Sequence, residues 1–457
     1  MTQVATVGFT RPLKIREFRA LWSAELVSLV GDQVARVALS LVVFNQTSSA
    51  ALTALTYALT FIPTVLGGFL LSGLADRFPR RAVLVVNDLL RAALAALMAV
   101  PGLPLPALWI FVALLSVAAG PFKAAQMSLL PQVLHGEALY GAGLALRQAS
   151  TPAAQLVGFA CGGALLAVVD PHLGMLLNAG TFLVSAALVL GGVRPRAAAR
   201  STTTTEDDRG AHHGVDLPRG KANLASLYAL VCLIGLYMVP EGLAAPYSNQ
   251  LGGAAFGVGL LLAADPAGGA IGAWLTTRVR IPTSPLSASI LAAAAGLALV
   301  GCGVGPGLPL SVALWATSGA LMAAYLIKTQ QLVVAAVPDR NRGRVMGRMG
   351  TCLYCSQGLS VLVGGVVAQA IGSFHAVASA GLLAALLALG IGIFSKIARS
   401  RSDTGSERDI VPESITTPYP SQQTPPPSTR TARTIRRPVL ARHGRPTGHP
   451  RTQVQPV

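Results

Sequence analysis

The chain has 457 residues, of which 52% are hydrophobic and only 12% are charged. Soluble domains carry about 25% charged residues, so this composition excludes an ordinary soluble enzyme and indicates a protein with many membrane spans. Lysine and arginine outnumber aspartate and glutamate by 35 to 18, which gives a formal net charge of +17. An excess of this size also occurs in nucleic-acid-binding proteins, so its position along the chain decides its meaning.

Apolar segments of about 20 residues, the length that spans a bilayer, follow one another from Phe18 to Lys396. The first six predicted helices cover residues 18–44, 51–74, 82–101, 106–130, 140–168 and 172–193. Six more cover residues 223–245, 253–277, 284–304, 307–329, 345–371 and 374–396. The sequence therefore predicts an all-α membrane protein with twelve transmembrane helices.

The basic residues are distributed unevenly between the two sides that this topology creates. Predicted loops without any lysine or arginine are 45–50, 101–106, 169–172, 246–252, 305–308 and 372–375. All other basic residues lie on the opposite side, except four inside predicted helices, namely Arg36, Arg91, Lys123 and Arg147. Because cytoplasmic loops are rich in lysine and arginine, we expect a multi-pass protein of the cell membrane with both termini in the cytoplasm. The same bias explains the net charge without a nucleic acid.

Two polar stretches divide the chain. Residues 194–222 are expected to form a flexible cytoplasmic linker between an N-terminal six-helix bundle, residues 1–193, and a C-terminal one, residues 223–397. Residues 398–457 hold ten prolines and ten arginines and too few large apolar side chains to fold alone. This segment is expected to be a disordered cytoplasmic tail, which is either simply solvated or binds a partner.

Pairs of small residues recur at a constant spacing of 201 or 202 positions. The pairs are Gly67-Gly68 with Gly268-Gly269, Gly162-Gly163 with Gly364-Gly365, and Ala179-Gly180 with Ala380-Gly381. The shared spacing indicates two parallel repeats of six helices. Two pseudo-symmetric bundles of this kind suit a transporter in which one half rocks against the other around a central site.

The predicted loop between the second and third helices carries a charged motif. Asp76 ends one helix, Arg77, Arg80 and Arg81 open the next, and Gly73 allows a close backbone approach. Such charges can pair across neighbouring helix ends and clamp a gate, although basic residues here could also be simple membrane anchors. The segment resembles the G-x-L-A-D-R-x-x-R-R motif of the major facilitator superfamily, which implies a cytoplasmic gate.

Further segments resemble one branch of that superfamily, the enterobactin exporters and macrolide-efflux proteins. They are Phe18-Arg19-Ala20-Leu21-Trp22 with Gly31-Asp32, Asn87-Asp88-Leu89-Leu90-Arg91-Ala92, and Val337-Pro338-Asp339 with Arg342-Gly343-Arg344-Val345-Met346-Gly347. The resemblance covers about residues 12–396 and implies a proton-driven exporter of lipophilic compounds. Asp88 and Arg91, with Lys123 and Arg147, are assigned to the charge network of the cytoplasmic gate rather than to the substrate site.

A glycine motif in the fifth predicted helix departs from the family pattern. Gly158, Gly162 and Gly163 resemble the antiporter motif G-P-x-x-G-G, but Phe159 stands where that motif has proline. A proline would kink the helix and free a carbonyl group. The glycines therefore serve either the antiporter geometry or helix packing alone.

Ionisable residues inside predicted helices point to the transport site, because each costs about 2.5–3.5 kcal/mol at the bilayer centre. Glu25, Asp32 and Arg36 fall on one face of the first helix, and Arg36 lies one turn beyond Asp32, so the two can neutralise each other. Asp265 lies mid-helix before Pro266, which disfavours helix there. Each carboxylate either exchanges protons in a cavity or belongs to a structural ion pair. Glu241 is expected at a solvated rim.

These features predict a secondary transporter, not an enzyme, that exports a small lipophilic or amphipathic compound in exchange for protons. Asp32, Arg36, Asp265 and Glu25 are its candidate cavity residues. No metal site and no cofactor are expected, because Cys352 and Cys355 have no further ligands nearby. The alternatives are an importer or uniporter on the same scaffold, and a membrane receptor or scaffold that recruits partners through its tail. The expected partners are a small-molecule substrate, protons and the lipid bilayer.

Overall fold

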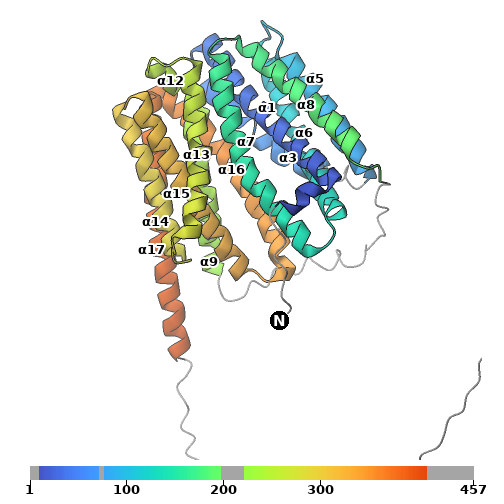
Figure 1. Cartoon of the computed structure of the whole chain (residues 1–457). Helices are drawn as coiled ribbons and strands as arrows, with labels where there is room; N and C mark the ends of the chain where they lie inside the picture. The colour runs from blue at the N-terminus through green and yellow to red at the C-terminus, as the bar shows by residue number, and fades with distance from the viewer. Residues whose placement is uncertain (1–9, 72–76, 197–220, 409–457) are drawn as a thin grey trace, which may run out of the picture. The chain divides into compact units, whose positions relative to one another are not determined.

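The computed structural model of the chain describes residues 10–71, 77–196 and 221–408, and within these ranges all regular elements are helices (Figure 1). Eleven of the described segments are long and apolar enough to cross a membrane. The remaining span is α5, Arg80–Met98, which packs against α6 and α8 although it carries several charged residues. The prediction of a twelve-helix membrane protein is therefore confirmed.

The first half of the molecule holds six spans. Its elements are η1 (Arg11–Lys14), α1 (Arg16–Thr47), α2 (Ala50–Ala58), α3 (Ile62–Leu71), α5, α6 (Leu105–Val133), α7 (Glu137–Leu166) and α8 (Pro171–Gly192). Local sequence fixes several helix starts. The Ser49 side chain accepts a hydrogen bond from the Leu52 amide at the start of α2, and Asp170 caps α8 through the His172 amide at 2.8 Å. Both are residue types that favour the N-cap position.

The second half repeats this plan. Its elements are α9 (Lys221–Cys232), α10 (Ile234–Tyr237), α11 (Val239–Gly242), α12 (Ala244–Gln250), α13 (Ala255–Arg278), α14 (Pro285–Val300), η2 (Gly301–Val304), α15 (Leu308–Ala336), α16 (Asp339–Ile371) and α17 (Ser373–Arg408). Ser284 and Ser287 form a reciprocal capping box at the start of α14. Most of the predicted linker, residues 197–220, and the tail beyond Arg408 lie outside the described residues.

Three predicted helices differ from the structure, and the sequence explains why. The second span breaks between α2 and α3 because Pro63 cannot donate to the Leu59 carbonyl. The seventh span divides into α9 to α12, with Pro240 and Pro246 at its breaks. The last helix runs to Arg408, well past the predicted end at residue 396, since the next proline occurs only at position 412.

Glycine contacts reveal the relation between the halves. A Cβ atom at Gly67 in α3 would lie 2.0 Å from the Val117 carbonyl oxygen of α6, and one at Gly268 in α13 would lie 1.8 Å from the Ala316 carbonyl oxygen of α15. Equivalent helices of the two halves thus cross in the same way, at positions 201 residues apart. The third predicted pair behaves differently, because a Cβ at Gly180 would meet no described atom within 4 Å.

The two halves meet mainly through two helix pairs, α7 with α13 and α2 with α16, and Figure 1 shows α7 and α13 side by side. In both pairs the two helices come closest at the end of the bundle where α1 ends and α2 begins. A Cβ at Gly163 would lie 2.5 Å from the Gly259 Cα atom, and Ser49 donates a hydrogen bond to Gln369 at 3.1 Å. This end of the bundle is called the α1–α2 end. The halves are closed against each other there.

Candidate functional site

A cavity of about 500 Å³ lies between the two halves, and most of its wall is apolar. The four candidate cavity residues predicted from the sequence, Glu25, Asp32, Arg36 and Asp265, all line it. Three come from α1 of the first half and one from α13 of the second. A largely apolar cavity with a few convergent polar groups is the usual form of a small-molecule site.

Asp32 forms its ion pair with Arg91 of α5, at 2.9 Å, and not with Arg36 as predicted. Asn178 of α8 also donates to the Asp32 carboxylate, at 3.3 Å. The Arg91 guanidinium lies 4.0 Å from the centre of the Phe182 ring, which supplies a cation–π contact. Arg91 therefore lines the cavity, and its assignment to the charge network of the cytoplasmic gate stays a prediction. Its side chain is 6% exposed and that of Asp32 is 24% exposed.

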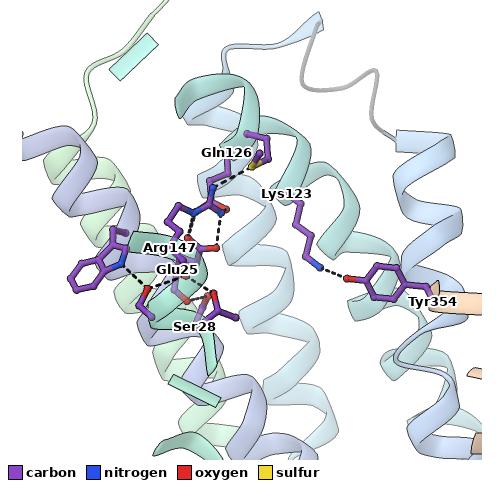
Figure 2. A network of polar contacts seen from close by, with 10 residues as sticks. Glu25, Ser28, Lys123, Gln126, Arg147 and Tyr354 are labelled. Atoms are coloured by element: carbon purple, nitrogen blue, oxygen red, sulfur yellow. Dashed lines mark hydrogen bonds and ion pairs between the residues drawn. The ribbon is translucent and has the colours of Figure 1, made fainter. Parts of the chain in front are cut away.

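Glu25 is held by Arg147 of α7 in a two-pronged ion pair (Figure 2). The Arg147 Nε and Nη2 atoms donate to the two Glu25 oxygens, each at 2.6 Å. Gln126 of α6 donates to the same carboxylate at 3.1 Å and accepts from Arg147 at 3.0 Å. Bidentate arginine–carboxylate pairs are strong and directional. This cluster therefore ties α1, α6 and α7 together at the cavity wall.

Glu241 is buried in α11 and is 8% exposed, so its predicted position at a solvated rim is wrong. Tyr57 of α2 donates a hydrogen bond to the Glu241 carboxylate across the two halves. The Arg36 guanidinium lies 5.6 Å from the centre of the Tyr57 ring and 5.8 Å from that of Phe61. Glu241 and Asp32 both act electrostatically on Arg36. Two aromatic rings and two carboxylates thus lie near Arg36, whereas the ion pair of Asp32 is with Arg91.

Replacing Tyr57 by Phe is expected to loosen the closed α1–α2 end. The change removes a hydrogen bond to a carboxylate, worth about 1.5–3 kcal/mol, so the closed population should fall roughly tenfold or more. A cysteine at Met238, in a variant without native cysteines, should then react faster with a thiol reagent added from the α1–α2 side. Tyr247→Phe removes a bond to Ser311 inside the second half and should leave the rate unchanged. An unchanged rate in Tyr57→Phe would contradict this role.

Asp265 lies in α13, which continues as a helix through Pro266 despite the predicted disturbance. Gly319 of α15 makes room for it, since a Cβ there would lie 2.7 Å from the Asp265 Oδ1 atom. Glu241 acts electrostatically on Asp265, and the ion pairs among the described residues do not include Asp265. The cavity thus brings the two carboxylates of the second half, Asp265 and Glu241, close to each other, and Glu241 close to Arg36 of the first half.

Of the predicted gate motif, the structure describes Arg77, Arg80 and Arg81, and the last two connect the start of α5 to α6 and α8. Arg80 donates to the Ser128 carbonyl of α6 at 2.9 Å, and Arg81 donates to the Leu190 carbonyl of α8 at 2.5 Å. Arginine near the C-terminal end of a helix is favourable because free carbonyl groups and the helix dipole attract it. Arg77 is exposed. Gly73 and Asp76 lie outside the described residues, so their predicted pairing is not described.

Asp88 of α5 and the three glycines of the motif in α7 contact neighbouring helices. Asp88 is buried in α5 and accepts a hydrogen bond from Ser185 of α8 at 2.6 Å. A Cβ at Gly158 would lie 2.8 Å from the Val30 carbonyl oxygen of α1, and one at Gly162 would lie 3.1 Å from the Val34 Cα atom. These glycines bring α7 against α1, while Gly163 brings it against α13. Nothing among the described residues groups three or more metal-ligating side chains.

The sequence model of the Major Facilitator Superfamily matches residues 21–280, more than half of the chain. The chain belongs to this superfamily. It is therefore a multi-pass membrane transporter and not an enzyme.

Relatives within the superfamily span almost the same length. The uncharacterised MFS-type transporter YvqJ of Bacillus subtilis is 25% identical over 416 residues, covering 86% of this chain and 96% of the relative. The multidrug efflux pump Tap of Mycobacterium tuberculosis is 27% identical over 415 residues, covering 85% and 94%. Among solved structures, a bacterial homologue of the lysosomal transporter Spinster, inward-facing and occupied, has a TM-score of 0.63 at 15% identity, with coverage of 87% and 97%. At that identity the likeness shows the fold alone.

Sequence reasoning missed the uncharged polar residues of this transporter's cavity. Asn178, Gln126 and Tyr354 line it and each bond to a charged side chain, and Tyr57 bonds to Glu241, which also lines it. The sequence carries a signal for these residues, because each is a polar residue within an otherwise apolar segment. Buried polar groups need partners, so such interruptions indicate where a charged partner on a neighbouring helix lies.

Proposed function

We propose that this transporter exports a small lipophilic or amphipathic compound by alternating access, driven by protons that enter as the compound leaves. The observation that carries the proposal is the place of Asp32, whose carboxylate is partly exposed to the cavity while its partner Arg91 is almost fully buried. A carboxylate in this place is accessible from the cavity both to an entering proton and to the substrate, and intramembrane carboxylates are typical of proton pathways. The mostly apolar wall suits a lipophilic substrate.

The direction of transport follows from the orientation that we propose. We propose that both termini and the Gly73–Arg81 motif lie in the cytoplasm, because cytoplasmic loops are rich in lysine and arginine. Arg80 and Arg81 would then control the gate together with Asp76. In that orientation the closed α1–α2 end faces outward and the cavity receives substrate from the cytoplasmic side. The similarity to the efflux pump Tap and the motifs of the enterobactin-exporter and macrolide-efflux branch support export, and with it a role in drug resistance.

The proton gradient is large enough for such work. One proton moving across 100 mV releases about 2.3 kcal/mol. At about 1.4 kcal/mol for each factor of ten, this can sustain roughly a fiftyfold gradient of a neutral solute. The proposal therefore requires only one coupled carboxylate per cycle, and Asp32 is the first candidate, with Asp265 and Glu25 as the others.

Reconstitution tests the proposal. The full chain in liposomes should move a lipophilic dye such as ethidium out of the compartment that corresponds to the cytoplasm when an opposing proton gradient is imposed, and addition of dye should release protons. An importer would move dye and protons in the same direction, and a uniporter would move dye without protons. A receptor or scaffold would move neither, and deletion of residues 398–457 would then be the change that abolishes its function.

A further inference from the structure

Lys123 of α6 lines the cavity without an ion pair to any carboxylate of the described residues, in contrast to Arg91 and Arg147. Arg91 pairs with Asp32, Arg147 pairs with Glu25, and Arg36 lies beside Tyr57, whose hydroxyl bonds to Glu241. Among the described residues, the ion pairs include no carboxylate for Lys123, although its side chain lines the cavity and is exposed there.

The partner of Lys123 is a neutral ring from the other half of the transporter. The Lys123 Nζ atom donates to the Tyr354 hydroxyl of α16 at 3.2 Å and lies 5.4 Å from the centre of that ring. Figure 2 shows the lysine extended toward Tyr354, away from the cluster of Glu25, Gln126 and Arg147. Tyr354 therefore holds the ammonium group in the space between the halves without neutralising it.

An ammonium group in this place has unused binding capacity. Lysine has three donors, and Tyr354 accepts one. An ionisable side chain at membrane depth is costly, and its usual justification is a partner in the transport pathway. The other acids of the cavity wall are engaged elsewhere or, like Asp265, belong to the opposite half. The natural partner of Lys123 is consequently an acidic group that enters the cavity with the substrate.

We propose that Lys123, positioned by Tyr354, is an anion-binding subsite, and that the preferred substrates are amphiphiles with one apolar body and a carboxylate. The acidic group would bind the Lys123 ammonium, and the apolar body would lie against cavity residues such as Leu115, Phe122 and Met98. Because the ligand contacts α6 through Lys123 while Tyr354 belongs to α16, its acid competes with a contact between the halves. This inference rests on the proposed function, since it names the substrate class of the same cavity.

A matched pair of ligands tests the subsite. Dansyl-labelled undecanoic acid and its methyl ester share one fluorescent tail and differ in a single negative charge. Binding of each to the full chain in nanodiscs of zwitterionic lipid is measured by fluorescence, after subtraction of empty nanodiscs. A charge-assisted contact should make the acid bind about tenfold more tightly than the ester. In Lys123→Gln this ratio should fall to about one, with the affinity for the ester unchanged.

Three variants separate an anion site from a structural contact. Lys123→Arg should keep the preference for the acid, and so should Tyr354→Phe, because the aromatic ring that lies 5.4 Å from the ammonium group is retained. Lys328→Gln is the matched control: Lys328 of α15 bonds to the Ile281 carbonyl between α13 and α14 and is not among the residues that line the cavity, so its loss should not change the ratio.

The outcomes distinguish this inference from the proposed function. Equal binding of acid and ester to the wild type, or an acid preference that survives in Lys123→Gln, would overturn the anion subsite alone. If Lys123→Gln and Tyr354→Phe each lowered the affinity for the acid and for the ester equally, the anion subsite would also be overturned. The Lys123–Tyr354 contact would then only stabilise the packing of the two halves. Failure of the wild type to bind either ligand would overturn the lipophilic cavity, and the subsite with it.

Discussion

Asp32→Asn is expected to abolish proton-driven accumulation while dye exchange without a gradient continues. The amide keeps the shape of the carboxylate and its contact with Asn178, but it neither takes up nor releases a proton. In liposomes the dye gradient driven by a proton gradient should fall to the level of empty liposomes, a loss of at least about tenfold if the full proton energy is normally used. Exchange of labelled for unlabelled dye should remain, since the apolar cavity is unaltered.

The same change has a structural cost that must be measured separately. Arg91 loses its acidic partner, and breaking a fully buried pair costs about 3–5 kcal/mol. Asp32 is partly exposed, so solvent screening reduces this to about 1–2 kcal/mol. Thermal unfolding in detergent should therefore show a modest loss of stability. Asp170→Asn is the matched control, because Asp170 is an exposed N-cap residue outside the membrane spans and asparagine caps equally well.

The variant Asp265→Asn tests whether the proton site lies in the second half instead. If Asp32 is the coupling group, Asp265→Asn should change the apparent affinity for the dye more than the coupling. Intact coupling in Asp32→Asn with lost coupling in Asp265→Asn would move the proton site to the second half. Intact coupling in both variants would contradict the whole assignment of the site.

The spans could be predicted from the sequence because the bilayer imposes a simple rule on each segment independently. A run of about 20 apolar residues suffices for a helix, whatever it packs against. The breaks at Pro63, Pro240 and Pro246 follow from a rule that is equally local, the missing proline donor, and were legible although the prediction drew continuous helices. The span α5 differs from the others in its charged residues, which bond to α1, α6 and α8.

Side-chain partners could not be predicted in the same way, because they depend on how helices cross. Helix periodicity offered Arg36 as the partner of Asp32, one turn away, whereas the structure supplies Arg91 from a helix that lies 59 residues further along the chain. Glu241 was misplaced for a related reason. The prediction placed Glu241 near the outer end of one continuous helix. In the structure the seventh span is divided into short helices, and Glu241 bonds to Tyr57 of the other half.

The glycine repeat of 201 or 202 positions shows that the sequence also carries information on how helices pack. Gly162 and Gly364 lie 202 positions apart, and each packs on the first helix of its own half, against Val34 and Val239. Their neighbours Gly163 and Gly365 both cross to the other half. A pattern visible in the sequence thus encodes both the helix packing inside each bundle and the contact between bundles, which is the contact that alternating access must break.

Gly163→Leu is accordingly expected to stop transport by holding the halves apart at the α1–α2 end. A Cβ at this position would lie 2.5 Å from the Gly259 Cα atom and 3.3 Å from the Phe256 carbonyl oxygen. Backbone atoms cannot move aside as a flexible side chain would, and overpacking of this kind costs about 1–3 kcal/mol or more. Because two conformations of a transporter differ by only a few kcal/mol, the closed state should become the minor one. Efflux should fall at least tenfold, since the cycle needs both states.

Pulsed EPR between spin labels at Val168 and Asn249 should detect this opening directly, as a growth of the longer distances in Gly163→Leu. Gly259→Leu lies on the other side of the same contact and should give the same result. Gly180→Leu is the control, because a Cβ atom there would meet no described atom within 4 Å, and it should transport like the wild type. A folded Gly163→Leu protein with unchanged distances and normal efflux would mean that the α7–α13 crossing does not close this end. The glycine repeat would then record only how the bundles are packed, and the moving contact would have to lie between α2 and α16.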